Sequence, residues 1–179
     1  MKSAQAVLDF WFVESGSKRW FKQSDAFDAL CRDRFLPTLE AARLGECWEW
    51  RSSPAGRCAE IIVLDQFSRN LFREDPRAYA QDGMALVLAQ EAVVAGDDAR
   101  MTADQRYFSY MPYMHSESTA VHREGIKLFE TLDNPQALRY EKAHAAVIAQ
   151  FGRYPARNKA LGRISTSEEL AYLENNKTF

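Results

Sequence analysis

The sequence has few cysteines, and their spacing excludes a disulfide framework. There are three, an odd number, and no two of them form a C-x-x-C pair. Cys58 lies near Ile61 and Ile62, which is typical of a small buried hydrophobic side chain rather than of a nucleophile. Reduced cysteines used in this way suit a reducing compartment, so we expect a cytoplasmic protein.

Long hydrophobic runs are also missing. A membrane-spanning helix needs roughly 18 or more consecutive apolar residues. The longest candidate, residues 84–95, is interrupted by Gln90 and Glu91. Residues 1–12 lack the basic region, apolar run and small-residue cleavage site of a secretory signal. We therefore expect no membrane span and no membrane partner.

Neither sign of charge is in large excess, because 23 Lys and Arg stand against 25 Asp and Glu, a net charge of −2. This balance supplies no basic field for nucleic acid, so we expect no nucleic-acid partner. Eight glycines and six prolines exclude collagen-like and linker-rich chains. The length of 179 residues predicts a single domain over residues 1–179.

Helix signals recur along the chain, whereas strand signals are almost absent. Proline follows a capping residue at positions 53–54, 75–76 and 134–135, an order typical of helix starts. Residues 102–105 and 166–169 have the pattern of capping boxes. Short loops predict antiparallel helical hairpins in a TPR-like superhelical arrangement. The sequence thus predicts an all-α protein of about eight helices, over residues 3–12, 25–44, 54–72, 76–95, 102–110, 117–132, 135–151 and 167–174.

The first polar motif lies in the apolar segment 61–73, which carries Asp65 and Arg69. Four residues apart on a helix, these two side chains face the same way inside an apolar stripe. Buried charges must be paired, so the sequence predicts a buried ion pair. Two roles are open. The pair is either an internal brace, or the wall of a site where Asp65 is an acid, base or ligand acceptor and Arg69 holds an anion.

The second polar motif covers residues 104–117, where aromatic side chains crowd around Pro112 before His115 and Glu117. We expect an aromatic turn after the predicted helix ends at residue 110. This turn is either the mouth of a pocket or a buried corner with Glu117 placed for a helix dipole. No H-E-x-x-H or Cys/His spacing is present, so we expect no metal site and no cofactor.

The third polar motif is rich in arginine. Arg153, Arg157 and Arg163 fall within eleven residues, with Asn158 among them. Pro155 predicts a short helix whose N–H groups attract anions. Arginine offers a planar fork that fits a carboxylate or a phosphate. A solvated basic turn, or arginines that bond helix C-termini, would give the same pattern.

Three separated motifs in this order resemble an uncharacterised, mainly bacterial family with a TPR-like all-helical fold. The resemblance extends to the opening segment and so covers nearly the whole chain. It implies the fold but no activity, cofactor or site residue. This sequence departs from the pattern at Ala156, where the family usually has histidine, and at Ser68, where proline is common. The stretches concerned are VLDFWF at 7–12, LDQFSRN at 64–70, RYF at 106–108, MHSE at 114–117, QFGRYPARN at 150–158, LGR at 161–163 and ST at 165–166.

Two functions follow from these motifs. The first is a pocket for a small anionic molecule, a carboxylate or phosphate, with possible hydrolytic chemistry in which Asp65, Glu117 or His144 is the general base. Its ligand-binding residues would be Arg69, His115, Arg153, Arg157 and Asn158. The second is a TPR-like module without catalytic activity that binds a peptide or protein, and whose polar motifs only brace the helices. Convergence of the motifs on one cavity favours the first function, and arginines spread along an open groove favour the second.

Overall fold

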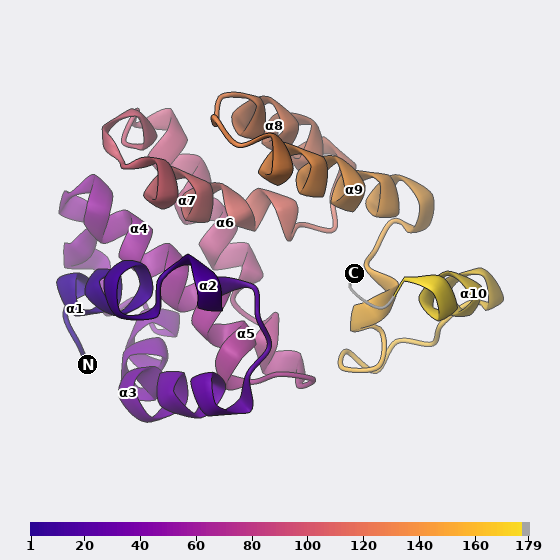
Figure 1. Cartoon of the computed structure of the whole chain (residues 1–179), viewed down its shortest axis with the longest axis horizontal. Coiled ribbons are helices and arrows are strands. Elements are labelled where there is room, and N and C mark those ends of the chain that lie inside the picture. Colours follow the sequence, from indigo (N-terminus) through magenta and orange to yellow (C-terminus); the bar gives the residue numbers. More distant parts are fainter. Residues whose placement is uncertain (177–179) are drawn as a thin grey trace.

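The computed structural model describes residues 1–176, and this part of the chain folds into helices and turns without a strand (Figure 1). The prediction of an all-α protein is confirmed, whereas the TPR-like arrangement and the single domain over residues 1–179 stay predictions. The α-helices are α1 (Ala4–Leu8), α2 (Ser17–Trp20), α3 (Asp25–Arg43), α4 (Pro54–Ile62), α5 (Ser68–Leu71), α6 (Asp82–Val94), α7 (Ala103–Met114), α8 (Thr119–Glu130), α9 (Pro135–Phe151) and α10 (Ser167–Asn175).

Helix α4 lies at the centre of the packing, because it contacts α1, α6 and α7. From α6 onward each helix packs on the next one, so that α6 contacts α7, α7 contacts α8 and α8 contacts α9. Helix α10 lies at the far end of the molecule, beyond the segment that leaves α9 (Figure 1). The predicted packing of consecutive helices therefore holds for α6 to α9.

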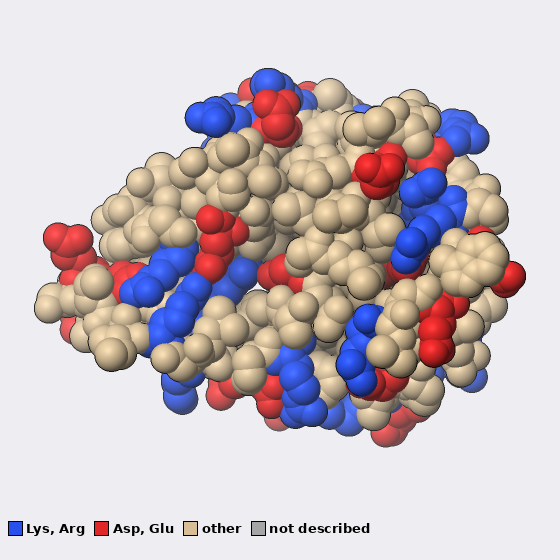
Figure 2. Space-filling view, turned by 180° about the vertical axis from the view of Figure 1, so that it is seen from behind, with Lys and Arg blue, Asp and Glu red and all other residues tan. Residues whose placement is uncertain are grey.

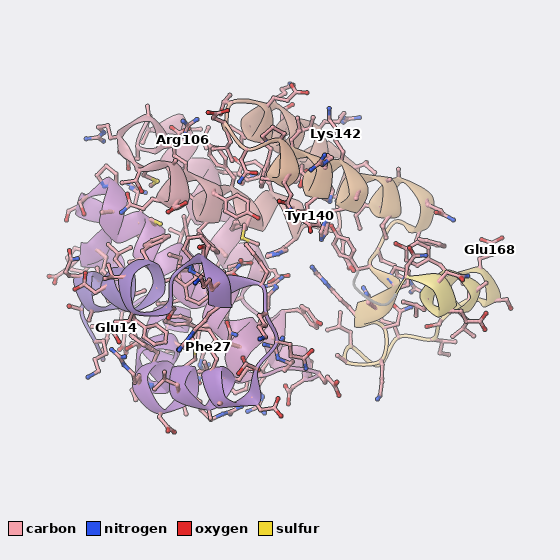
Figure 3. All side chains as sticks on the ribbon, viewed as in Figure 1. Glu14, Phe27, Arg106, Tyr140, Lys142 and Glu168 are labelled. Atoms are coloured by element: carbon pink, nitrogen blue, oxygen red, sulfur yellow. The ribbon has the colours of Figure 1, made fainter. Side chains whose placement is uncertain are left out.

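Aromatic rings form the interior between the first helices. The Trp11 ring meets those of Phe67 and Phe108 edge to face, with centroids 5.6 and 5.4 Å apart. The Phe35 ring lies 4.8 Å from that of Phe67, and all four residues are fully buried. Phe27 faces the same interior, while the labelled Glu14 lies at the edge (Figure 3). This core fixes the segment after α4, and that segment carries the first polar motif.

Side-chain caps at the predicted positions explain why several helices start where they do. The Asn134 side chain accepts a hydrogen bond from the N–H of Ala137 at 3.0 Å. Both halves of the capping box between Thr102 and Gln105 are formed. Helix α9 ends at Gly152, whose φ of 70° is accessible to glycine at little cost. The predicted helix 135–151 matches α9 residue for residue.

The predicted helix 54–72 is continuous from Pro54 to Leu71, but its middle turn is wider than an α-helix. The segment Val63–Phe67 is π-helical and joins α4 to α5, and all five of its residues are buried. A second π-helical segment, Asp9–Ser15, continues α1 beyond the predicted end at residue 12. Such turns are uncommon and concentrate at functional sites. The π-helical segment Val63–Phe67, which contains Asp65, therefore indicates that the first polar motif is a candidate functional site.

Two predicted boundaries differ from the observed ones by more than three residues. The predicted helix 76–95 begins only at Asp82, because the Asp75 side chain caps a single 3₁₀ turn, Pro76–Ala78, through the N–H of Arg77. The predicted helix 102–110 runs on to Met114, so the expected aromatic turn is helical and Pro112 lies inside α7. Every residue of 108–114 is buried, and this packing outweighs the hydrogen bond that proline cannot donate.

Gly56 is the position where the packing tolerates a side chain least. A Cβ atom there would lie 2.0 Å from the carbonyl oxygen of Trp50, a backbone atom. Gly56→Ala should therefore lower the free energy of unfolding by about 1–3 kcal/mol. Gly83→Ala is the matched control, because a Cβ there meets nothing within 4 Å. It should be neutral or stabilise by roughly 0.5–1 kcal/mol. Urea denaturation measures both, and equal effects of the two substitutions would contradict the packing described.

Candidate functional site

Asp65 is the most deeply buried charged residue of the three polar motifs, with 1% of its surface exposed. Arg69 Nη1 donates to its Oδ1 and to its backbone oxygen, both at 3.0 Å. The predicted ion pair is thus confirmed. Gln66 donates to the second carboxylate oxygen. Burial acts to raise the pKa of Asp65, but Arg69 and His115 outweigh it and hold that pKa well below its usual range, so the carboxylate stays charged.

His115 follows directly after α7 and points its ring at Asp65. Its Nδ1 lies 2.6 Å from Asp65 Oδ1. Burial, and then the Arg69 charge, lower the pKa of His115, so the imidazole is neutral near pH 7. An acceptor at Nδ1 places the single proton there and leaves Nε2 as a lone pair. No described residue forms a hydrogen bond with this Nε2, and 12% of the side chain is exposed.

Asp82, the first residue of α6, connects the first polar motif to the third. Its carboxylate accepts two hydrogen bonds from Arg69, at 2.8 and 3.0 Å, and one from Arg157 Nη1 at 3.1 Å. Arg157 Nη2 donates to the backbone oxygen of His115 at 2.9 Å. The second and third motifs therefore meet. The sequence analysis missed Asp82 because it placed this residue inside a helix that began at Pro76.

Two tyrosines enclose the Arg157 guanidinium, and the sequence analysis singled out neither. Its central carbon lies 4.8 Å from the centroid of the Tyr79 ring and 4.4 Å from that of Tyr154. Rings at these distances attract the cation and restrict its orientation. The Tyr154 hydroxyl donates to the backbone oxygen of Met114 at 2.6 Å, which fixes its ring. Burial lowers the pKa of Arg157, although a guanidinium remains charged at any physiological pH.

Glu117 is held by the third motif. Both of its oxygens accept hydrogen bonds from Arg163, at 2.7 and 3.0 Å, and the N–H of Tyr154 donates to it at 2.7 Å. Burial acts to raise the pKa of Glu117, but these hydrogen bonds lower it overall, so it stays ionised. A carboxylate with this many donors is a poor proton acceptor, which disfavours Glu117 as the general base.

Arg153 and Asn158 lie away from the other predicted site residues. Arg153 forms a two-pronged ion pair with Glu169 at 2.6 and 2.8 Å, and Asn158 Nδ2 donates to the same carboxylate at 3.1 Å. Glu169 also closes the capping box of α10 with Thr166. These contacts hold α10 against the turn after α9. Arg153 and Asn158 thus brace the first turn of the C-terminal helix.

The remaining histidines differ in exposure. His144 is half-buried on α9, and its Nδ1 lies 2.8 Å from the backbone oxygen of Tyr140. Burial lowers the pKa of His144 to about 4. His122 is fully buried between Glu141, at 2.8 Å, and the Tyr154 hydroxyl, at 3.1 Å. Within residues 1–176 no group of three or more potential metal-ligating side chains comes together.

Two cavities share Tyr79, His115 and Arg157 among their lining residues. We name the first the arginine cavity; its volume is about 250 Å³, and it is lined by Arg69, Arg73, Glu74, Ala78, Tyr79, His115, His144, Tyr154, Ala156 and Arg157. We name the second the α6 cavity; its volume is about 320 Å³, and it is lined by Pro76, Tyr79, Ala80, Asp82, Gly83, Leu86, Pro112, His115, Ser116, Glu117, Arg157 and Leu161. Figure 2 shows a hollow on the far face of the molecule with basic and acidic side chains on its rim.

The wall of the arginine cavity contains a strained residue. Glu74 has φ 63°, the only positive φ of a non-glycine residue in the described part of the chain. This conformation costs of order 1–3 kcal/mol and tends to persist at functional sites. Glu74 is also the single carboxylate in this lining, against the three arginines Arg69, Arg73 and Arg157. Each of these arginines is also ion-paired outside the lining, Arg69 with Asp65 and Asp82, Arg73 with Asp28, and Arg157 with Asp82.

Comparison with known proteins places the chain in a family. The sequence pattern described as "Bacterial protein of unknown function (DUF924)" matches residues 7–177. The chain belongs to DUF924. A solved structure, titled as a protein of unknown function from Agrobacterium tumefaciens, is 35% identical to this DUF924 protein. The two superpose with a TM-score of 0.92 over 97% of each chain. A search of curated proteins gives no match.

The family assignment confirms the resemblance seen in the sequence. It also gives the two departures from the DUF924 pattern a place in the structure. Ala156, at the position where the resemblance implies a histidine, lines the arginine cavity. Ser68 is buried at the start of α5 and lines neither cavity. No helix of residues 1–176 is long and apolar enough to cross a membrane.

The two cavity histidines should make the protein less stable in acid. Burial lowers the pKa of both His115 and His144, whereas an unfolded histidine titrates near about 6.5. Below that pH the unfolded chain binds more protons than the folded one. The free energy of unfolding should thus fall as the pH is lowered from about 7 to about 4.

The measurement is urea denaturation at several pH values across this range. His144→Gln should flatten the slope, because this variant removes one of the groups that protonate on unfolding. Greater stability at about pH 5 than at about pH 7, or an unchanged slope in His144→Gln, would contradict the burial of these rings.

Proposed function

We propose that the protein binds a small anionic molecule, a carboxylate or a phosphate, in the arginine cavity and hydrolyses a bond beside His115. The observation that supports this proposal best is the Asp65–His115 pair, of which His115 lines both cavities. A neutral imidazole with a buried carboxylate on one nitrogen and an accessible second nitrogen is well suited to general-base catalysis.

The chemical step needs only water and the substrate. Nε2 of His115 accepts a proton from a water molecule while the water oxygen attacks the carbonyl or phosphoryl centre. The imidazolium formed in this way is stabilised by Asp65. The bond to the leaving oxygen then breaks, and the imidazolium returns its proton to that oxygen. One water is consumed, and the products are an acid, which releases its remaining acidic proton to solvent, and an alcohol. In this proposal His115 is the base, and Asp65, which we considered as a base on sequence alone, is a positioning residue.

Arg157 is the proposed anion-binding residue. A guanidinium has five N–H donors. Two nitrogens of Arg157 bond to Asp82 and to the His115 backbone oxygen, which leaves further N–H groups for a ligand in the cavity. Tyr79 and Tyr154 hold the group in place, so little side-chain entropy is lost on binding. Arg69 and Arg73 line the same cavity, and each is already paired with an aspartate, so Arg157 is the arginine assigned to the ligand.

The placement of the motifs favours this function over a peptide-binding module. Asp65, Arg69, His115 and Arg157 converge on one site from three separate sequence motifs. Arg153 and Arg163 are not spread along a groove, because each is paired with a carboxylate of the same end of the molecule, Glu169 and Glu117. Convergent charges at the edge of a cavity are the usual form of a small-molecule site.

Anion binding should depend on Arg157. Inorganic phosphate should raise the melting temperature of the native protein, by the amount that its affinity and concentration dictate. Arg157→Met should weaken phosphate binding about tenfold or more, because a charge-assisted hydrogen bond is lost. Isothermal calorimetry measures the dissociation constant directly. Arg153→Met is the matched control: it loses an ion pair of the same kind but outside both cavities, and should leave the dissociation constant unchanged. No phosphate binding to the native protein, or equal weakening in both variants, would contradict the proposal.

Hydrolysis should depend on His115. Nitrophenyl phosphate and the nitrophenyl monoester of succinic acid are suitable probes, because each carries an anion and releases a coloured product. His115→Gln should lower kcat about 10²–10⁴-fold. Asp65→Asn should lower kcat and shift the pH profile of the reaction, since His115 loses its acceptor. Arg153→Met should retain the native rate. If no such ester or phosphate is turned over, or if His115→Gln is as active as the native protein, His115 is not a base.

A further inference from the structure

We infer that the α6 cavity receives an apolar group of the same substrate. The substrate class is then a phosphate monoester, or the monoester of a small dicarboxylic acid, whose hydrolysable bond joins the anionic part to a short alkyl chain or a single ring. This inference rests on the proposed function, because it takes the arginine cavity as the anion site. It adds the chemical character of the group on the other side of the hydrolysed bond.

The carboxylates of the α6 cavity are already neutralised by arginine. Asp82 is paired with Arg69 and Arg157, and Glu117 is paired with Arg163. Neither of them is a ready partner for a further cation. A cation placed in this cavity would lose hydration without gaining a free counter-charge, and Arg157, the one arginine of this lining, is the residue already assigned to the anion. The cavity therefore disfavours a cationic group, although it has six polar residues in its lining.

The rest of the lining is apolar. Three aliphatic side chains from different segments face this space, namely Leu86 of α6, Pro112 of α7 and Leu161 after the arginine motif. Pro76 and Ala80 complete the apolar part. An apolar group that enters such a cavity leaves water and is stabilised in proportion to its buried area.

His115 lines both cavities, so one reaction at His115 can involve ligand groups in each of them. His115, Tyr79 and Arg157 line both of them, so a ligand bound at this boundary has one end in each. The bond nearest to Nε2 then lies between the anionic part and the apolar part. The cavity volumes, about 320 and 250 Å³, fit one small molecule and are too small for a polymer. Hydrolysis at this place would release an apolar alcohol and a small anion.

The test uses a chain-length series. The probes are inorganic phosphate and ethyl, butyl and hexyl phosphate, with acetate, butyrate and hexanoate as the carboxylate arm. Isothermal calorimetry on the native protein should show a dissociation constant that decreases about fourfold for each added methylene until the cavity is full. Inorganic phosphate, which has no apolar part, should bind weakly but measurably.

Gly83→Leu fills the α6 cavity without disturbing the arginine cavity. Gly83 lines the α6 cavity, and a Cβ atom there would meet nothing within 4 Å. Leucine is also a better helix former than glycine, so the variant should fold at least as well as the native protein, which its melting temperature checks. Val87→Leu is the control, because Val87 is exposed on the same helix and lines neither cavity.

In Gly83→Leu the affinity should no longer depend on chain length, while the affinity for inorganic phosphate stays at the native value. Val87→Leu should behave like the native protein. If native protein binds phosphate and hexyl phosphate equally well, the inference is wrong although the anion site stands. The same holds if Gly83→Leu keeps the chain-length dependence, because the chain then lies elsewhere. If no probe of either arm binds at any length, the proposed function and this inference both fail.

Discussion

The buried carboxylate of Asp65 is the interaction on which the rest of the site depends. It lies in a π-helical turn with almost no exposed surface, and it accepts hydrogen bonds from Arg69 and His115. Burying a charge is costly unless it is paired and its lone pairs are used. Arg69 satisfies Asp65 and in turn attracts Asp82, which then holds Arg157. The removal of any member would leave an uncompensated charge for its neighbours, so the group is expected to behave as a unit.

This chain of pairs also explains how distant segments are joined. Asp65 and Arg69 lie between α4 and the end of α5, Asp82 starts α6, His115 follows α7, and Arg157 lies after α9. Figure 3 shows nitrogen-tipped side chains that point into the space between α5 and the segment after α9. The same contacts that bring these helices together also orient an imidazole and a guanidinium at the edge of two cavities. Stability and the proposed chemistry therefore rest on the same residues, which is why control variants outside the cavities matter.

Parts of the site were predictable from local patterns. The i, i+4 spacing of Asp65 and Arg69 in an apolar stripe indicates a buried pair, and the structure has it. The crowding of aromatics and charges singled out the second and third motifs as candidate site segments, and Arg157 of the third bonds to the His115 backbone of the second. No local sequence pattern indicated the other partners in the site. Asp82 and Tyr79 stand in segments where the sequence indicated an ordinary helix, and the partner of Glu117, Arg163, lies 46 residues further along the chain.

By itself, the sequence determined the helical class and most helix starts, because a cap and the residue it bonds are only two or three positions apart. It also determined which charges lie on apolar faces. Only the tertiary structure decided that Pro112 stays inside α7, since the burial of its neighbours outweighs one lost hydrogen bond. Packing likewise decided which arginine reaches which carboxylate. Arg153 and Arg157 are four residues apart and chemically identical, yet one bonds Glu169 and the other bonds Asp82. That choice depends on where α6 and α10 lie, and no local pattern contains it.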